Sequence, residues 1–286
     1  MEKKQRILLL FFALIAAVLL ALAAVYDLAL DTFLYRPASV FAILGEAFCY
    51  WPLYLPFALL GGVMAALPDT KLYRRALGVA LCAACFSGLF ASALTTLATR
   101  GLLGAVRVPA WLLLGAMLTL CTVFSLCKAN RAALIKLAFL AKFGIVLCVL
   151  DNGIIHWLKH FFSRMRYDDM VRLGDFSAFS PWYQRGAFAG NTSFPSGHVA
   201  SACGILVVLL LPLLFRRLQG KELPLTLLCY GYIALCALSR MVIGRHFLSD
   251  TVAAATIVSI LFFAMLSSRC FQAKLRHTLQ RAETER

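Results

Sequence analysis

Eight apolar runs, each long enough to cross a lipid bilayer as a helix, constrain what this chain can fold into. A membrane-spanning helix needs about 20 mostly apolar residues, because the hydrocarbon offers no hydrogen-bond partner to an open backbone. The chain has 286 residues and 62% of them are hydrophobic. The runs cover residues 7–26, 41–67, 76–98, 110–127, 134–158, 198–215, 224–241 and 249–268. We therefore predict an all-α fold, a polytopic membrane helix bundle of about eight transmembrane helices.

The first run has a second interpretation, a cleaved signal peptide. Basic residues precede it, and small residues lie near Ala21 and Ala24. The apolar stretch from Ile7 to Val25 is longer than the apolar part of a signal peptide, which is about 7–15 residues. We therefore predict an uncleaved first helix.

The net charge of +15 would suggest a nucleic-acid partner in a soluble protein, so its placement decides its meaning. Cations gather before the first run and after every even-numbered run: Lys3, Lys4, Arg6; Lys71, Arg74, Arg75; Lys128, Arg131; Arg216, Arg217, Lys221; Arg269, Lys274, Arg276, Arg281 and Arg286. By the positive-inside tendency, both termini are expected in the cytoplasm. The basic tail after residue 268 is expected to contact anionic membrane lipids, and we expect no nucleic-acid partner.

The ten cysteines do not indicate a disulfide framework. Eight of them lie within apolar runs, where a free cysteine behaves as a small apolar residue: Cys49, Cys82, Cys85, Cys121, Cys148, Cys203, Cys229 and Cys236. Cys82 and Cys85 have the spacing of a redox pair but lie in the middle of a run, so we expect both to be structural.

A turn motif comes directly before the sixth run. Pro195, Ser196, Gly197 and His198 precede the apolar stretch Val199–Phe215, so a turn is expected to end there and a buried helix to begin. The first turn of a helix leaves backbone N–H groups unpaired and carries the positive end of the helix dipole. This is an arrangement that suits a phosphate.

A second group of polar residues lies around the junction of the seventh and eighth runs. Arg240 is followed by His246 and Asp250, which are four residues apart. On a helix this spacing puts the imidazole and the carboxylate on one face, so the acid can hold one ring nitrogen and leave the other free to react. Two more cations, Lys159 and Arg166, lie at the end of the fifth run. By the charge pattern, all these groups fall on the extracytoplasmic side.

Together these groups have the chemistry of a site that breaks a phosphate ester. His246 could act as a nucleophile that forms a phosphohistidine, with Asp250 orienting the ring. His198 could give a proton to the leaving oxygen and later act as a base on water. The charged oxygens would be held by Lys159, Arg166, Arg240, the Ser196 hydroxyl and the Gly197 backbone.

The pattern resembles the type 2 phosphatidic acid phosphatase family, also called lipid phosphate phosphatases, whose fold is shared with vanadium haloperoxidases. The family motifs K-x6-R-P, P-S-G-H and S-R-x5-H-x3-D correspond to Lys159 through Arg166, to Pro195-Ser196-Gly197-His198, and to Ser239-Arg240 with His246 and Asp250. The resemblance implies the same roles: His246 as nucleophile, Asp250 as its partner and His198 as acid. It also implies a mechanism without a metal or other cofactor.

Three positions keep two interpretations. Tyr167 stands where the family has proline, so Arg164 competes with Arg166 for the position of the motif arginine. Glu46, in the second run, is either a structural residue at the membrane interface or a substrate contact. His156, near the end of the fifth run, is better explained as a hydrogen-bonded interfacial histidine beside Trp157 than as a catalytic one.

The resemblance implies three parts: N-terminal transmembrane helices (1–133), a catalytic core (134–268) and a basic cytoplasmic tail (269–286). The expected activity is hydrolysis of a lipid phosphate or polyprenyl diphosphate at the extracytoplasmic face. A bacterial plasma membrane would fit substrates such as undecaprenyl diphosphate, phosphatidylglycerophosphate or lipid A phosphate. The alternatives are a phosphotransferase that passes the phosphate to another lipid, and a non-catalytic lipid transporter or scaffold.

Overall fold

The computed structural model describes residues 3–68, 70–104, 108–187 and 190–285. Within these residues the regular secondary structure is entirely helical. The α-helices are α1 (Lys3–Leu34), α2 (Val40–Phe48), α3 (Trp51–Ala66), α4 (Leu72–Thr99), α5 (Val108–Cys127), α6 (Arg131–Phe162), α7 (Tyr167–Leu173), α8 (Gly197–Ala202), α9 (Leu211–Leu214), α10 (Glu222–Val242), α11 (Leu248–Ser267) and α12 (Arg269–Thr284). Two 3₁₀ segments, Cys203–Leu210 and Arg216–Leu218, complete them.

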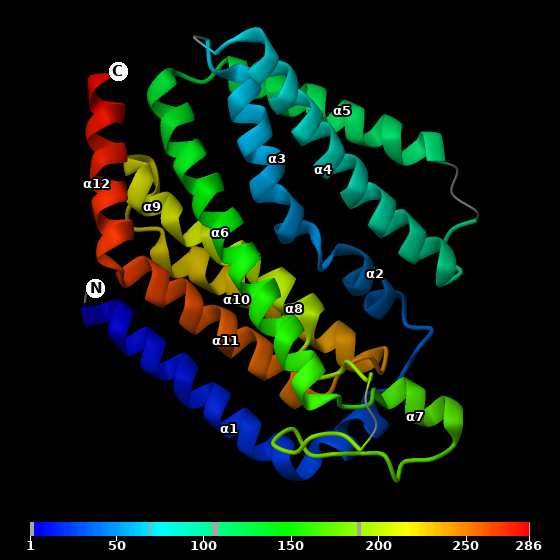
Figure 1. Ribbon diagram of the computed structural model, residues 1–286. Helices are drawn as coiled ribbons and strands as arrows, with labels where there is room; N and C mark the ends of the chain where they lie inside the picture. Colours follow the sequence, from blue (N-terminus) through cyan, green and yellow to red (C-terminus); the bar gives the residue numbers. More distant parts are fainter. Residues whose placement is uncertain (1–2, 69, 105–107, 188–189, 286) are drawn as a thin grey trace. The chain divides into compact units, whose positions relative to one another are not determined.

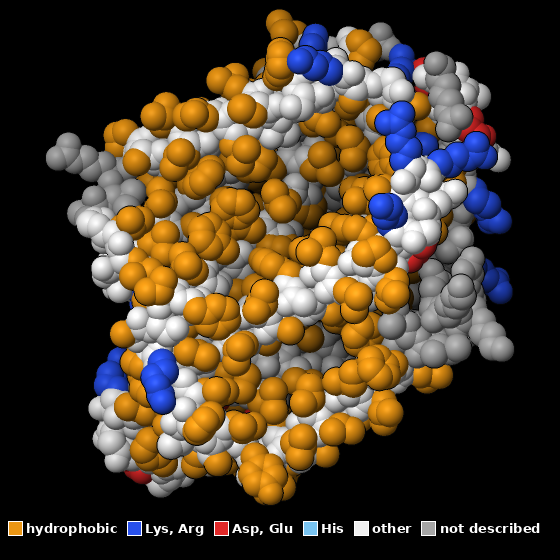
Figure 2. Space-filling view, turned by 180° about the vertical axis from the view of Figure 1, so that it is seen from behind, with side chains coloured by type: hydrophobic (Ala, Val, Ile, Leu, Met, Phe, Trp, Pro, Cys, Tyr) orange, Lys and Arg blue, Asp and Glu red, His pale blue; other side chains and the backbone are white. Residues whose placement is uncertain are grey.

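Eight candidate membrane spans occur in the described residues, in the order that the apolar runs predict. They are Leu10–Leu34, Val40–Ala66, Leu72–Thr99, Val108–Cys127, Arg131–Leu173, Gly197–Leu214, Glu222–Val242 and Leu248–Ser267. The predicted all-α bundle of about eight spans is therefore confirmed, and the eight apolar helices indicate an integral membrane protein. On the face shown in Figure 2, hydrophobic side chains dominate the surface, as expected for contact with lipid tails.

The structure differs from the predicted runs in three places. The first helix continues to Leu34, past the predicted end near residue 26. The second run is broken between Phe48 and Trp51, because Pro52 cannot donate a helical hydrogen bond and restricts the residue before it. The sixth run is α-helical only to Ala202 and then tightens into the 3₁₀ segment.

The described chain forms two compact units that alternate along the sequence. The first unit comprises Met1–Cys49, Leu150–Cys203 and Tyr230–Phe263, and the second comprises Tyr50–Val149, Gly204–Cys229 and Ala264–Arg286. Each unit therefore draws on distant parts of the sequence.

The second unit is built on closely packed helices. Helices α3, α4 and α5 lie side by side in it (Figure 1). A Cβ atom placed on Gly61 would lie 2.6 Å from the Gly78 carbonyl oxygen, and one placed on Gly78 would lie 2.6 Å from that of Gly61. The two backbones therefore touch, which is how membrane helices associate without a hydrophobic driving force between them. In the same unit α12 packs on α6, with the Phe271 ring centroid 5.1 Å from that of Phe143.

In the first unit, α1 lies beside α11 (Figure 1). Near its start the Phe12 ring stacks on Tyr230 of α10, with centroids 4.1 Å apart. Near its end α1 carries two buried acids, Asp27 and Asp31, which are 1% and 0% exposed. The segment after α7 also packs on α1, since the Trp182 indole donates a hydrogen bond to the Leu20 carbonyl. Helix α1 is therefore part of the packing of this unit.

Candidate active site

The three predicted groups of polar residues meet within the first unit. Lys159 lies in the last turn of α6, His198 in the first turn of α8, and His246 between α10 and α11. The ring centroids of His198 and His246 are 6.2 Å apart, with 59° between the ring planes. The two imidazoles, 48 positions apart in the chain, therefore lie close to each other.

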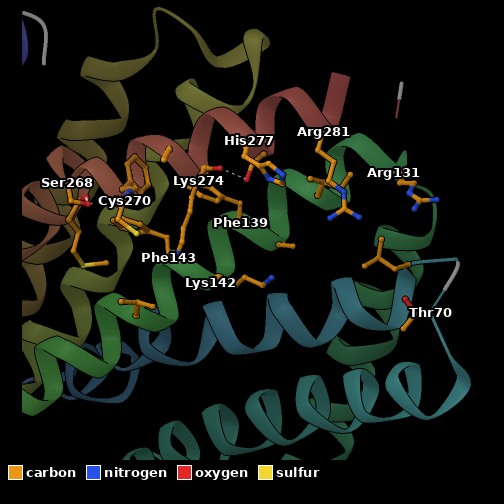
Figure 3. A pocket seen from close by; sticks show the side chains of 18 residues that line it. Thr70, Arg131, Phe139, Lys142, Phe143, Ser268, Cys270, Lys274, His277 and Arg281 are labelled. Carbon is orange, nitrogen blue, oxygen red and sulfur yellow. Dashed lines mark hydrogen bonds between the residues drawn. The ribbon is translucent and has the colours of Figure 1, made fainter. Parts of the chain in front are cut away.

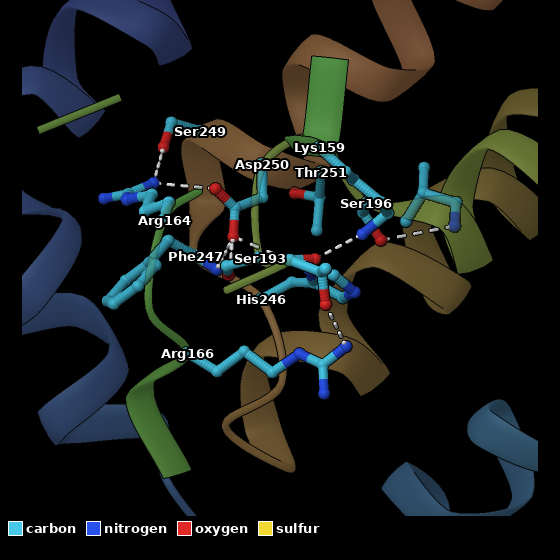
Figure 4. Close-up of polar contacts among 12 residues, drawn as sticks. Lys159, Arg164, Arg166, Ser193, Ser196, His246, Phe247, Ser249, Asp250 and Thr251 are labelled. Atoms are coloured by element: carbon cyan, nitrogen blue, oxygen red, sulfur yellow. Dashed lines mark hydrogen bonds and ion pairs between the residues drawn. The ribbon is translucent and has the colours of Figure 1, made fainter. Parts of the chain in front are cut away.

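Asp250 lies directly behind His246 and is fully buried, with 0% of its surface exposed. Its Oδ2 atom accepts hydrogen bonds from the Phe247 backbone N–H at 2.9 Å and from the Ser193 hydroxyl (Figure 4). The His246 Nδ1 atom is 3.5 Å from the same oxygen, longer than a normal N–H···O hydrogen bond. In this structure Nδ1 is therefore at contact distance from Asp250 without a hydrogen bond to it.

Burial controls the charge of His246. The side chain is 2% exposed, and burial lowers its pKa from 6.5 to about 3. The carboxylate of Asp250 opposes this shift, while the cation of Lys159 adds to it. The ring is therefore neutral at physiological pH, which leaves a nitrogen lone pair available for attack on phosphorus.

The geometry separates the two candidate arginines. The Arg164 side chain is 1% exposed and points into the protein, where Nη1 donates to Asp250 Oδ1 at 2.7 Å and to the Ser249 hydroxyl at 2.8 Å. Its Nε donates to the Ser180 carbonyl at 2.8 Å. Arg164 thus lies behind Asp250 and is committed to protein partners. Arg166 is only partly buried and donates to the Thr192 hydroxyl at 3.0 Å, and in Figure 4 it lies on the same side of Asp250 as His246.

Asp27 completes the group behind Asp250, and the sequence interpretation missed it. Its Oδ2 atom is 2.9 Å from Arg164 Nη2 and also accepts from the Ser249 hydroxyl, and its Oδ1 accepts from the Ser249 N–H at 3.0 Å. A carboxylate in a membrane-spanning segment is a functional candidate by default. Asp27 directly follows the predicted run 7–26, so a longer first helix would have made it such a candidate. Ser193 and Ser249 gave no such signal, because small hydroxyls are common in membrane helices.

Lys159 and Arg166 share one partner. The Lys159 ammonium donates to the Thr192 carbonyl, and the Arg166 guanidinium donates to the hydroxyl of the same residue. Lys159 also lies against the start of α8, because a Cβ atom placed on Gly197 would lie 3.4 Å from its Cε. Both cations are therefore held next to the turn that carries His198.

Arg240 is fully buried, with one ion pair and two further donors. Its Nη2 atom is 3.1 Å from Glu46 Oε1, and the Glu46 side chain is 12% exposed. Its Nε and Nη1 have no hydrogen-bond partner among the described residues. A buried donor without a partner costs about 1–3 kcal/mol, so these two atoms favour an anionic ligand.

A close helix contact sets the position of Glu46. A Cβ atom placed on Gly45 would lie 2.2 Å from the Ser239 hydroxyl, so α2 and α10 can approach this closely only with glycine there. The contact brings Glu46 beside Arg240. The structure therefore gives Glu46 an ion pair with Arg240, a residue of the predicted site.

The turn before α8 has the predicted form. The Ser196 hydroxyl caps the helix by accepting from the Val199 N–H at 3.4 Å, and the Ser196 N–H donates to the Asp250 carbonyl at 2.9 Å. The Phe194–Pro195 peptide bond is cis. The backbone of this turn is therefore tied to the helix that carries the acid.

His156 is outside this cluster. It is exposed, and its ring lies 4.4 Å from that of His160 on the same helix. Among the residues that the structure describes, no group of three or more His, Cys, Asp or Glu side chains is arranged to hold a metal ion. The groups available to bind a ligand near the two histidines are thus cations and backbone or hydroxyl donors.

Comparison with known proteins assigns part of the chain to a family. Residues 137–276 match the family model described as PAP2 superfamily, and the segment includes every predicted site residue from Lys159 to Asp250. Asp27 and Glu46 lie outside the matched segment. A search of curated proteins found no match to the chain, and a search of solved structures found none. Residues 137–276 therefore form a PAP2 superfamily domain in the C-terminal half of the chain.

Proposed function

We propose that this protein is a membrane-embedded phosphatase that hydrolyses a lipid phosphate or a polyprenyl diphosphate through a phosphohistidine on His246. Membership of the PAP2 superfamily indicates a phosphatase acting on phosphate esters. The observation that best supports the mechanism is the pair of imidazole rings 6.2 Å apart, with Asp250 on the Nδ1 side of His246. The apolar helices around the site favour a substrate that resides in the membrane.

The first chemical step transfers the phosphoryl group to the protein. His246 Nε2 attacks phosphorus in line with the bond to the leaving oxygen, so a P–N bond forms as the P–O bond breaks. His198 gives its proton to the leaving oxygen, which departs as a lipid alcohol or a lipid monophosphate. Asp250 stabilises the ring of His246 as it becomes positively charged.

The second step releases the phosphate. A water molecule attacks the phosphohistidine, His198 accepts the proton of that water, and the P–N bond breaks. The products are inorganic phosphate and the free enzyme, with His198 protonated for the next cycle. The two steps use only His246, His198 and water, and no cofactor.

The cations stabilise the charge on the transferring group. Arg240 Nε and Nη1, the Lys159 ammonium and the Arg166 guanidinium would bind the equatorial oxygens, together with the Ser196 hydroxyl and the Gly197 N–H. Loss of one such donor typically lowers kcat by about 10²–10³-fold. We place this site at the extracytoplasmic face, with cytoplasmic termini, because the cations after even-numbered runs favour that orientation.

The test is phosphate release by the purified full-length protein from a panel of lipid phosphates in the presence of a chelator. We expect release by the wild type and none by His246→Ala. His156→Ala is the matched control, because His156 is an exposed histidine of α6 outside the site, and it should be fully active. A phosphoramidate on His246, stable in base and labile in acid, should accumulate after rapid quenching.

Three outcomes would contradict the proposal. Activity retained by His246→Ala would exclude His246 as the nucleophile. A requirement for a divalent ion would exclude the mechanism written here. A newly phosphorylated lipid in place of inorganic phosphate would assign transfer instead of hydrolysis.

A further inference from the structure

The second unit contains a large cavity that shares no lining residue with the candidate active site. Its volume is about 1010 Å³, and it lies between the N-terminal half of α6 and α12 (Figure 3). Pockets for small molecules typically have volumes of about 300–1,000 Å³, so this cavity is at the upper end of that range. All 18 lining residues belong to the second unit.

One wall of the cavity is mostly apolar. It includes Ile135, Phe139 and Val146 of α6, which are four and seven residues apart and lie on one face of that helix. Phe143 and Phe271 also line the cavity, and their ring centroids are 5.1 Å apart. This wall is suited to a hydrocarbon chain.

The other wall is cationic. Lys274, His277 and Arg281 of α12 are three and four residues apart, so they share one helix face, and Figure 3 shows them directed toward the space above α6. Lys142 of α6 also lines the cavity. Among the residues that the structure describes, the lining contains no aspartate or glutamate. Arg131, also in the lining, is 3.1 Å from Glu285 outside it.

Lys142 is the residue of the cavity whose surroundings most favour a bound anion. It is exposed and lies within the candidate span Arg131–Leu173, among apolar residues. A charge in a spanning segment is costly unless it is paired or reaches water. Within the described part of the chain, neither Lys142, Lys274 nor Arg281 forms an ion pair. An anion in the cavity would be a partner for all three.

We propose that this cavity binds one anionic phospholipid of the surrounding membrane. Its phosphate lies between Lys142 of α6 and the Lys274 and Arg281 side chains of α12, and one acyl chain lies along Ile135, Phe139 and Val146. A free phosphate would use the cations alone, and a zwitterionic lipid would bring its own cation to the cationic wall. Of these three ligands, only an anionic amphiphile would contact both the apolar wall and the cationic wall favourably.

The test is titration of the detergent-solubilised full-length protein with phosphatidylglycerol, followed by native mass spectrometry. Phosphatidylcholine with the same acyl chains is the comparison lipid. Lys274→Gln with Arg281→Gln should weaken phosphatidylglycerol binding by about 25-fold, since each cation contributes about fivefold. Arg269→Gln with Arg276→Gln removes the same charge from exposed positions of α12 outside the cavity, and binding should change less than twofold.

A variant of the apolar wall tests the proposal without changing the charge of the protein. Ala138→Trp fills the cavity from α6 and should weaken binding at least tenfold without altering any cation. The proposal is wrong if both double variants lose affinity equally, if phosphatidylcholine binds as tightly, or if Ala138→Trp has no effect. Displacement by inorganic phosphate at the same concentration would assign a free-anion site instead. His246→Ala should bind the lipid normally, which separates this site from the proposed phosphatase.

Discussion

Asp27 of α1 and Arg164 form a buried ion pair, with 2.9 Å between Oδ2 and Nη2 and side-chain exposures of 0% and 1%. The same guanidinium is 2.7 Å from Asp250, the acid that lies behind His246. The first helix of the chain is thus connected to His246, the proposed nucleophile, through only two intervening side chains, Arg164 and Asp250. Residues outside the family match therefore support the geometry inside it.

We predict that Asp27→Ala destabilises the protein by about 3 kcal/mol, because it leaves part of a buried charge uncompensated. Thermal unfolding in detergent measures this. Asp169→Ala is the matched control: it removes an acid that pairs with Arg172, whose side chain is 77% exposed, and such pairs contribute about 0–1 kcal/mol. Equal stability of Asp27→Ala and the wild type would show that Asp27 is not needed to hold Arg164.

The two arginines near the end of α6 should give opposite results. Arg166→Ala should lower kcat/KM about 10²-fold with little change in stability, because Arg166 is partly exposed and is proposed to contact phosphate. Arg164→Ala should lower the unfolding temperature sharply, because it leaves Asp27 and Asp250 buried without their cation. Melting curves and kinetics measured on both variants distinguish the two roles. If Arg164→Ala lowered mainly kcat/KM and Arg166→Ala lowered mainly the unfolding temperature, the assignments would have to be exchanged.

The low pKa of His246 predicts a pH dependence of stability. Its pKa is about 3 in the folded protein, against about 6.5 when unfolded, so between these values the unfolded chain binds a proton that the folded one does not. Stability therefore falls as the pH falls from 6.5 toward 3, by about 1.4 kcal/mol per unit from this group. His246→Gln should lose less stability over that window in unfolding experiments. Identical pH profiles would show that His246 is not buried as a neutral ring.

The contact between Gly45 and Ser239 predicts a steric effect on activity. Gly45→Val would place atoms about where the Ser239 hydroxyl lies, so α2 must move and carry Glu46 away from Arg240. We expect kcat/KM to fall at least tenfold. Gly153→Val is the control, since a Cβ atom at Gly153 of α6 has no neighbour within 4 Å. A fully active Gly45→Val variant would show that the site does not depend on this helix contact.

The apolar runs predicted the bundle well because lipid imposes one local requirement, about 20 apolar residues in a helix. The motifs predicted which groups meet, but the argument that His246 and Asp250 share one helix face was wrong, because His246 lies in the connection between α10 and α11 and only Asp250 is in the first turn of α11. The choice between Arg164 and Arg166 could not be made from spacing. It depends on how the chain leaves α6, where Ser163 adopts a φ of 46°, and on a carboxylate 137 positions earlier.

The missed residues share a physical reason. Asp27 looked like the end of an apolar run, because a single charge normally marks the membrane boundary. Its partners, Arg164 and Ser249, are far away in sequence and leave no local pattern. The second run was predicted as one continuous segment, residues 41–67, although Pro52 and Pro56 made an interruption of that run predictable.

Thr192 accepts from Lys159 through its carbonyl and from Arg166 through its hydroxyl. Thr192 thus fixes the positions of the Lys159 and Arg166 charges relative to each other in the absence of a ligand. An ammonium has three donors, so Lys159 keeps two to offer. In the proposed mechanism, little reorganisation energy would be needed when a phosphoryl group enters, because both cations are already held in place.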